Sequence, residues 1–146
     1  MRPLLWLALV GLAALGPSLA GCASAPPETA VPDTVVSVDL VRTFPGEQAN
    51  YLRFIEMNWA PARAEVRRLG DVVAYEVLVR EPTGDDWDVM LVTEYASREA
   101  FERREAVFGA LFQQPEFAMK PVNGKSPRDM AEIIGGGDTR PVLRSR

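Results

Sequence analysis

The side chains in this sequence that could do chemistry are carboxylates set inside apolar segments. Glu76 and Glu94 each stand in a run of otherwise apolar residues. Burial raises the pKa of a carboxyl group, so one of the two could act as a general acid or base. The alternative is that both point to a wet rim or pair with a cation such as Arg63 or Arg80, because charged groups are seldom buried unpaired.

Aromatic and charged residues elsewhere extend this set to the side chains that could line a cavity between helices and a sheet. They are Trp59, Arg63, Tyr75, Glu76, Trp87, Glu94 and Tyr95. From them we predict a ligand-binding group of Trp59, Arg63, Tyr75, Glu76 and Tyr95. Successive strand side chains point to opposite faces, so at most one of Tyr75 and Glu76 can share a cavity with Trp59. A core or interface role for Trp59 is the alternative, since large aromatic rings mostly contribute buried area.

The residue types that the chain lacks exclude several kinds of site. It has no histidine and a single cysteine, which excludes His-based triads, His-ligated zinc and haem held by a proximal histidine. Asp85, Asp86 and Asp88 lack the glycine and distal glutamate of an EF-hand loop, which favours a polar hairpin tip. We expect no metal and no cofactor. The net charge of −4 argues against nucleic acid as a partner.

Residues 1–21 are typical of an export signal. Arg2 precedes an apolar run over residues 4–15, which is shorter than the roughly 20 residues that a membrane-spanning helix needs. The segment ends in Leu-Ala-Gly-Cys, which resembles the lipobox of bacterial lipoproteins, where the cysteine is acylated and becomes the new N-terminus. We therefore predict that Cys22 anchors the chain to a membrane on the periplasmic side of a bacterial envelope. A plain signal peptide with a chance cysteine is the alternative.

The remainder divides into a tether and one domain. Residues 22–34 are rich in proline, alanine and threonine and have little to bury, which predicts an extended, flexible tether. Residues 35–146 are enough for one domain.

Three segments of this domain have the composition of strands. Residues 35–44, 72–79 and 87–95 are rich in β-branched and aromatic residues, and a polar turn over residues 82–86 joins the second and third as a hairpin. The second and third are apolar on both faces, unlike the strands of a sheet with one wet face. We therefore expect cover on both sides of the sheet, with a second copy of the chain supplying one of them.

Helical spacing of apolar residues marks the segments between and after these strands. Residues 47–69 predict a long helix that kinks near residues 58–60, because Pro61 removes a backbone donor. Ser97 predicts the cap of a helix that runs to residue 113.

The C-terminal part has weaker signals. The segment starting at Ser126 predicts a short helix that ends at residues 135–137. Residues 139–146 then form either an edge strand or a basic tail.

The resulting order of elements is that of ferredoxin-like α+β folds, with helices on one face of an antiparallel sheet. Residues 35–112 resemble the dimeric α+β barrel superfamily. The resemblance rests on the strand order, the proline-bearing first helix with Trp59, the strand GDVVAYEVLVREP and the passage WDVMLVTEYASREAF. This superfamily includes antibiotic-biosynthesis-monooxygenase-like, EthD-like and NIPSNAP-like domains. The resemblance implies a homodimer in which two sheets pack face to face. The histidine that haem-degrading members use is absent here.

Two functions remain open. The first is a membrane-anchored envelope lipoprotein whose dimeric domain binds a small apolar or aromatic ligand, or serves only as an interaction module. The second is a cofactor-independent monooxygenase-like or isomerase-like enzyme that uses Tyr, Trp and a glutamate of raised pKa. An enclosed pocket that brings Trp59, Tyr75 and Glu76 together would favour the second.

Overall fold

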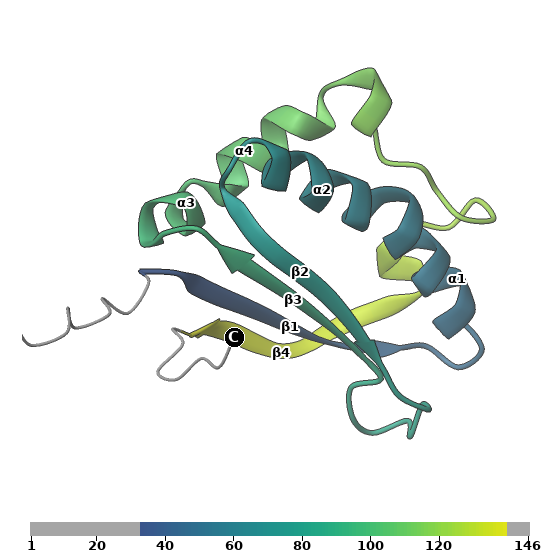
Figure 1. Ribbon diagram of the computed structural model, residues 1–146. Helices are drawn as coiled ribbons and strands as arrows, with labels where there is room; N and C mark the ends of the chain where they lie inside the picture. Colours follow the sequence, from purple (N-terminus) through teal and green to yellow (C-terminus); the bar gives the residue numbers. More distant parts are fainter. Residues whose placement is uncertain (1–32, 140–146) are drawn as a thin grey trace, which may run out of the picture.

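Antiparallel pairing organises the chain in the computed structural model, which describes residues 33–139 (Figure 1). The strands are β1 (Val35–Thr43), β2 (Val72–Val79), β3 (Val89–Tyr95) and β4 (Ala131–Thr139). They form one sheet in the order β2-β3-β1-β4. The helices are α1 (Gln48–Phe54), a π-helix (Ile55–Trp59), α2 (Ala60–Arg68), α3 (Arg98–Glu102) and α4 (Arg104–Phe112), with 3-10 turns at Pro115–Phe117 and Pro127–Asp129.

The long helices of residues 33–139 all lie on one side of the sheet, and none of them covers its other side, called the open side below (Figure 1). Residues of β3 that alternate toward the helices, such as Val89, Leu91 and Tyr95, are buried in two hydrophobic clusters. The first cluster packs α1 and the π-helix on β1 and β3, and the second packs α2 and α4 on β3. The ferredoxin-like α+β fold expected from the sequence is confirmed.

The kink predicted before Pro61 is present as a turn of π-helix. The Ala60 N–H donates to the carbonyl of Ile55, five residues back, instead of four. Pro61 has no N–H, so the regular ladder cannot continue through this turn, and the wider turn absorbs the mismatch. The regular hydrogen bonding of the helix is therefore interrupted at the position predicted for the kink.

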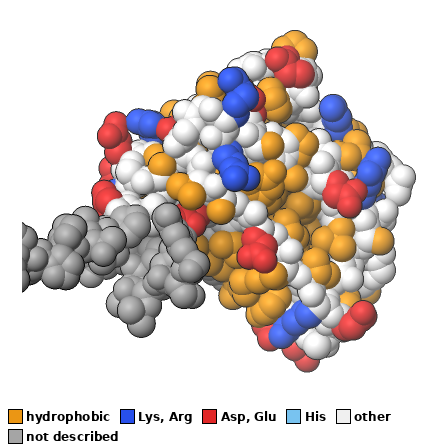
Figure 2. Space-filling model, viewed as in Figure 1, with side chains coloured by type: hydrophobic (Ala, Val, Ile, Leu, Met, Phe, Trp, Pro, Cys, Tyr) orange, Lys and Arg blue, Asp and Glu red, His pale blue; other side chains and the backbone are white. Residues whose placement is uncertain are grey.

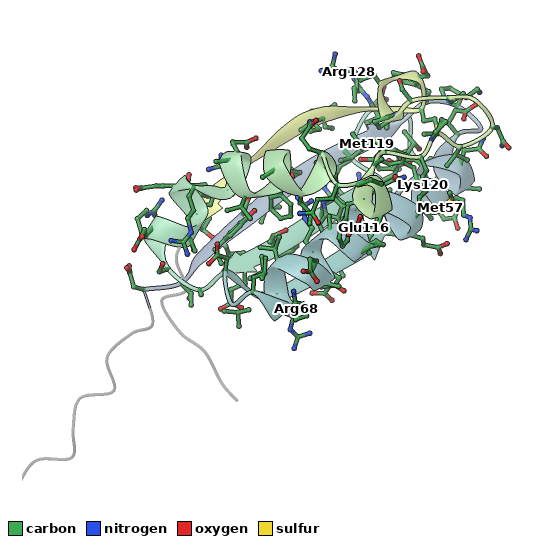
Figure 3. The ribbon with its side chains drawn as sticks, turned by 90° about the horizontal axis from the view of Figure 1, so that it is seen from above. Met57, Arg68, Glu116, Met119, Lys120 and Arg128 are labelled. Atoms are coloured by element: carbon green, nitrogen blue, oxygen red, sulfur yellow. The ribbon has the colours of Figure 1, made fainter. Side chains whose placement is uncertain are left out.

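Asn58 ties this turn to a distant loop. Its side-chain amide donates to the Lys120 carbonyl at 3.0 Å and accepts from the Lys120 N–H at 2.7 Å. Seen from above, Lys120 and Met119 lie beside Met57 (Figure 3). The loop after α4 is thus held against the π-helix by two hydrogen bonds between the Asn58 amide and the backbone of one residue, Lys120.

Ser97 caps the second helix as predicted, since its hydroxyl accepts from the Ala100 N–H at 3.1 Å. The helix is divided at Arg103 into α3 and α4, a break that the apolar spacing did not indicate. The Arg103 guanidinium binds the carboxylate of Asp71 and, at 3.0 Å, that of Glu99.

One prediction for the C-terminal part was wrong. The predicted helix after Ser126 is only the 3-10 turn, closed by a capping box between Ser126 and Asp129. The segment that follows is the edge strand β4 (Ala131–Thr139). Residues 140–146, for which an edge strand and a basic tail were both left open, lie outside the described residues. Pairing with β1 supplies backbone hydrogen bonds that outweigh the weak local preference of this short, glycine-rich segment.

A register irregularity between Val72 and Ala74 changes the side-chain alternation at the start of β2. Strict alternation would place Val72 on the same face as Ala74 and Glu76, whereas Val72 is buried against the helices and Val73 is 40% exposed. The irregularity adds one residue at the start of the strand and reverses its side chains there.

The predicted export signal and most of the predicted tether, including Cys22, lie outside the described residues. Among residues 33–139, no helix is long and apolar enough to cross a membrane.

Candidate ligand site under the helices

Trp59, at the end of the π-helix, faces the sheet and meets Tyr75 of β2. Their ring centroids are 5.7 Å apart and the rings are nearly perpendicular, at 78°. Edge-to-face contact of this kind is a favoured geometry for aromatic pairs. Tyr75, and not Glu76, is therefore the strand residue beside Trp59, which settles the choice that alternation left open.

Arg63, one helical turn after Trp59, is held between two aromatic rings. Its guanidinium carbon lies 4.5 Å from the centroid of Trp59 and 4.2 Å from that of Phe108 on α4. The Nε atom of Arg63 is buried and has no hydrogen-bond partner. Burial lowers the pKa of Arg63, while the nearby Tyr95 and Asp39 act in the opposite direction. A guanidinium remains protonated under such a shift, so the site contains a buried positive charge.

Asp39 is a site residue that the sequence analysis missed. It lies on the helix-facing side of β1, two residues from buried Val41, and is half-buried. Burial raises the pKa of Asp39 above its ordinary value of 3.8, and the positive charges of Arg63 and Arg104 partly oppose this. The reasoning applied to Glu76 and Glu94, a carboxylate within an apolar strand, would have found it.

Two phenols complete the surroundings of Arg63. Burial raises the pKa of Tyr51 to about 12 and also raises the pKa of Tyr95. Both hydroxyls therefore stay protonated at neutral pH and can donate hydrogen bonds. The predicted residues Trp59, Arg63, Tyr75 and Tyr95 thus share one region with Asp39 and Tyr51, which offers rings, a fixed cation and a carboxyl group.

Glu76 and Glu94 lie on the opposite side of the sheet and do not share a cavity with Trp59. Their partners across the strands are Val92 for Glu76, and Val36 and Ala74 for Glu94. Glu76 is exposed and Glu94 is 7% exposed. With their neighbours they line a shallow hollow of about 470 Å³ that Tyr75 borders from the edge.

Trp87 belongs to neither region. It lies between the hairpin turn and β3, and the guanidinium carbon of Arg80 is 4.3 Å from its ring centroid. Arg80 also forms an ion pair with Asp86. The prediction that grouped Trp87 with Trp59 was therefore wrong. Trp87 lies at the hairpin end of the sheet, whereas Trp59 contacts Tyr75 in the middle of β2.

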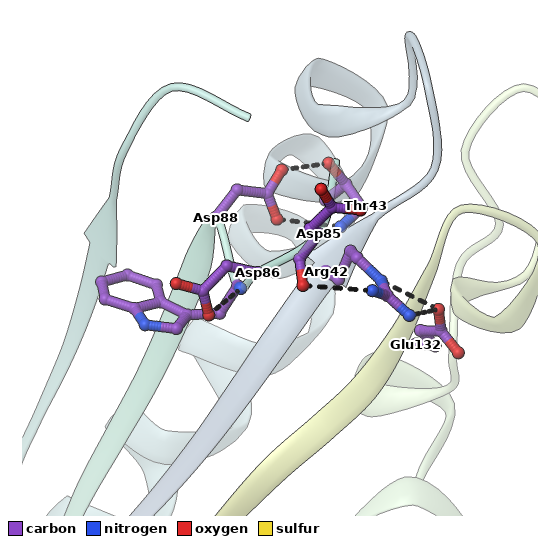
Figure 4. A network of polar contacts seen from close by, with 7 residues as sticks. Arg42, Thr43, Asp85, Asp86, Asp88 and Glu132 are labelled. Atoms are coloured by element: carbon purple, nitrogen blue, oxygen red, sulfur yellow. Dashed lines mark hydrogen bonds and ion pairs between the residues drawn. The ribbon is translucent and has the colours of Figure 1, made fainter. Parts of the chain in front are cut away.

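The acidic hairpin has a structural role (Figure 4). Asp88 is 1% exposed, accepts from the Thr43 N–H at 2.8 Å and also binds the Thr43 hydroxyl. The Asp86 carboxylate accepts from the Trp87 N–H at 2.8 Å. Within residues 33–139, no group of three His, Cys, Asp or Glu side chains is placed to hold a metal ion.

The open side of the sheet is mainly apolar. Figure 2 shows hydrophobic side chains gathered over the part of the surface where Figure 1 places the strands. Three cross-strand rows form this side: Leu78, Met90 and Leu40; Glu76, Val92 and Val38; Ala74, Glu94 and Val36. The prediction that these strands are apolar on both faces is confirmed.

No family model and no curated protein matches this sequence. Several solved structures resemble the fold. A dimeric ferredoxin-like protein from an uncultured marine organism is 15% identical, with a TM-score of 0.53 over 77% of this chain and 98% of that one. A NIPSNAP-like domain protein from Burkholderia xenovorans is 17% identical, with a TM-score of 0.53 over 79% and 90%. HapK from Hahella chejuensis is 19% identical, with a TM-score of 0.50 over 77% and 96%. The likeness confirms the fold that the sequence resemblance implied.

Proposed function

We propose that this chain is a lipid-anchored protein of a bacterial envelope whose ferredoxin-like domain forms a homodimer and binds a small apolar or aromatic ligand. The observation that carries the proposal is the division of the sheet into two different sides. One side holds a buried cation among aromatic rings, and the other presents rows of apolar side chains that no helix within residues 33–139 covers.

The homodimer follows from the open side. Monomeric proteins rarely expose a continuous apolar patch larger than a few hundred Å², and larger patches mark interfaces. The partly exposed side chains of Val38, Leu40 and Met90 lie in the middle of this apolar side. One solved structure of the same fold is described as dimeric. A second copy of this chain, placed sheet to sheet, would bury the same rows on both partners, as a two-fold interface requires.

Ligand binding follows from the helix-covered side. Trp59, Tyr75 and Phe108 offer ring faces and edges, and Arg63 and Asp39 are the charged groups among them. Binding sites for small molecules are commonly lined by aromatic side chains with a few polar groups that fix orientation.

The anchor rests on the N-terminal signal and on Cys22, the single cysteine of the chain. Lipidation at Cys22 would hold the domain at a membrane through residues 22–34. Stable attachment needs more than one acyl chain, which lipoprotein processing supplies.

An isomerase-like enzyme is a second candidate, and Asp39 is the observation that favours it. The glutamate expected beside Trp59 and Tyr75 lies on the other side of the sheet, but Asp39 offers a half-buried carboxyl group of raised pKa near the cation of Arg63. Such a pair can move a proton within a substrate without a cofactor.

Cross-linking in membranes tests the homodimer. Val38→Cys places a thiol in the middle of the open side, and Ala64→Cys places one on the exposed surface of α2. A short bismaleimide cross-linker should join two copies of the Val38→Cys protein and leave the Ala64→Cys protein monomeric on a denaturing gel. A monomeric Val38→Cys protein would contradict a sheet-to-sheet dimer.

A further inference from the structure

A cavity of about 450 Å³ lies at the β4 edge of the sheet, where α1 and the start of β4 meet. The buried residues that line it are Val41 of β1, Tyr51 of α1 and Ala131 of β4. Its exposed apolar residues include Phe44 and Ile133. Cavities of this size that are lined mainly by apolar side chains are typical of binding sites for small molecules.

Ile133 lies on the helix side of β4, but the helices do not cover it. It is paired with Val41 across the strands, so both side chains point to the same side of the sheet. Val41 is 1% exposed in the cluster packed against α1, whereas Ile133 is 67% exposed and Phe44, also in the cavity, is 37% exposed. An apolar ligand body in the cavity would remove the surface of both residues from water, which is favourable.

The charged residues of the cavity are Arg128 and Glu132, and only Glu132 has an ionic partner among residues 33–139. Glu132 pairs with Arg42 at 2.7 Å, whereas Arg128 is in none of the nine ion pairs of this part of the chain. Asp129, next to Arg128, accepts from the N–H and the hydroxyl of Ser126 at 2.8 and 2.7 Å. Seen from above, Arg128 lies at the β4 edge of the domain (Figure 3). The cavity thus combines apolar walls with a cation whose nearest carboxylates in sequence are engaged elsewhere.

We propose that this cavity binds a small apolar carboxylic acid, with the apolar body against Phe44 and Ile133 and the carboxylate on Arg128. Guanidinium and carboxylate groups match each other in shape, because both are planar and can form parallel hydrogen bonds. The cavity is a second site, separate from the contact of Trp59 with Tyr75, because β2 and β4 are opposite edges of the sheet. Binding there makes and breaks no covalent bond.

Fluorine NMR titration of the full-length chain in detergent micelles tests the proposal with 4-(trifluoromethyl)benzoate and its uncharged counterpart 4-(trifluoromethyl)benzamide. Titration of empty micelles measures the partitioning of each probe, which is then subtracted. Arg128→Gln removes the cation of the cavity, and Ile133→Ser removes part of its apolar wall. The matched controls are Arg67→Gln and Ile134→Ser, because neither residue lines the cavity and both are exposed. Arg128 and Ile133 are exposed as well, so all four variants should fold, which thermal melts check.

We expect the benzoate to bind about two- to fivefold tighter than the benzamide at low salt, which is the range for an exposed ion pair. This preference should shrink in about 1 M salt, where exposed charges are screened. Arg128→Gln should bind both probes equally, and Ile133→Ser should weaken the binding of both by about three- to tenfold. Both controls should behave as the unmodified protein.

Several outcomes would overturn the proposal. They are equal binding of the two probes by the unmodified protein, an unchanged preference in Arg128→Gln, and unchanged affinities in Ile133→Ser. Binding that Tyr75→Phe weakens and Ile133→Ser does not would place the ligand in the proposed site beside Trp59, and would leave the proposed function standing without this cavity. Binding of neither probe would count against both sites.

Discussion

The ring of Tyr75 meets the ring of Trp59 edge to face, with their centroids 5.7 Å apart. This contact joins the edge strand β2 to the π-helix and separates Tyr75 from its neighbour Glu76, which points to the open side. The two adjacent residues therefore belong to different surfaces of the domain.

Unequal effects of Tyr75→Phe and Glu76→Gln on ligand binding follow from this separation. Removing the Tyr75 hydroxyl should weaken binding of a small aromatic ligand by about two- to tenfold, the value of one hydrogen bond. Glu76→Gln should leave the dissociation constant within about twofold, since its carboxylate lies across the sheet. Calorimetric titration of both proteins measures this. Equal, negligible effects would assign both residues to ordinary core and edge positions.

The pH dependence of stability should identify Asp39. Its pKa is raised in the folded protein, so its contribution to stability is present at low pH and is lost as pH rises through the folded pKa. Asp39→Asn avoids that loss, so its melting temperature relative to the unmodified protein should increase between pH 4 and pH 7.

Asp71 supplies a control of opposite sign. Hydrogen bonds from Arg103 lower the pKa of Asp71, so its contribution is present above its ordinary pKa and is lost on acidification. Asp71→Asn should lose stability relative to the unmodified protein as the pH rises toward the ordinary pKa of 3.8, and the difference between the two proteins should stay nearly constant from pH 4 to pH 7. Thermal melts at matched ionic strength measure both, and parallel curves for Asp39→Asn would contradict the assignment.

Gly136→Ala should destabilise the domain by about 1–3 kcal/mol or more. Gly136 has a φ of +145°, and a Cβ there would come within 2.2 Å of the Val38 carbonyl oxygen. Gly137→Ala is the matched control, because a Cβ at Gly137 meets no atom within 4 Å. Chemical denaturation should therefore distinguish two adjacent glycines of β4. An equal loss of stability in both variants would contradict this prediction, because the close approach to Val38 exists only at Gly136.

Cys22→Ser should release the protein from membranes. Loss of the acylated thiol would remove the anchor that we propose, and the domain would appear in the soluble fraction or remain with its signal uncleaved. Fractionation and mass spectrometry of the processed chain distinguish these forms. Unchanged membrane association with unchanged mass would contradict lipidation at this residue.

The sequence by itself determined the features that depend on local pattern. Side-chain alternation indicated the two strands of the hairpin. The missing N–H of Pro61 indicated the interruption of the first helix, and the Ser97 hydroxyl indicated the cap of the second. Each of these effects acts between residues that are close in sequence. The apolar character of both strand faces was also visible, because alternation needs no knowledge of what covers either face.

Only the tertiary structure decided which distant side chains meet. β4 is a strand because β1 offers its backbone groups, although the local sequence favoured a short helix. Asp39 became a site residue because the helices cover its side of the sheet, while Glu76 and Glu94, which resemble it in sequence, face the other side. Strand alternation defines two faces but does not say which one the helices will cover, and that choice depends on the handedness of the connections and on the packing of the whole domain.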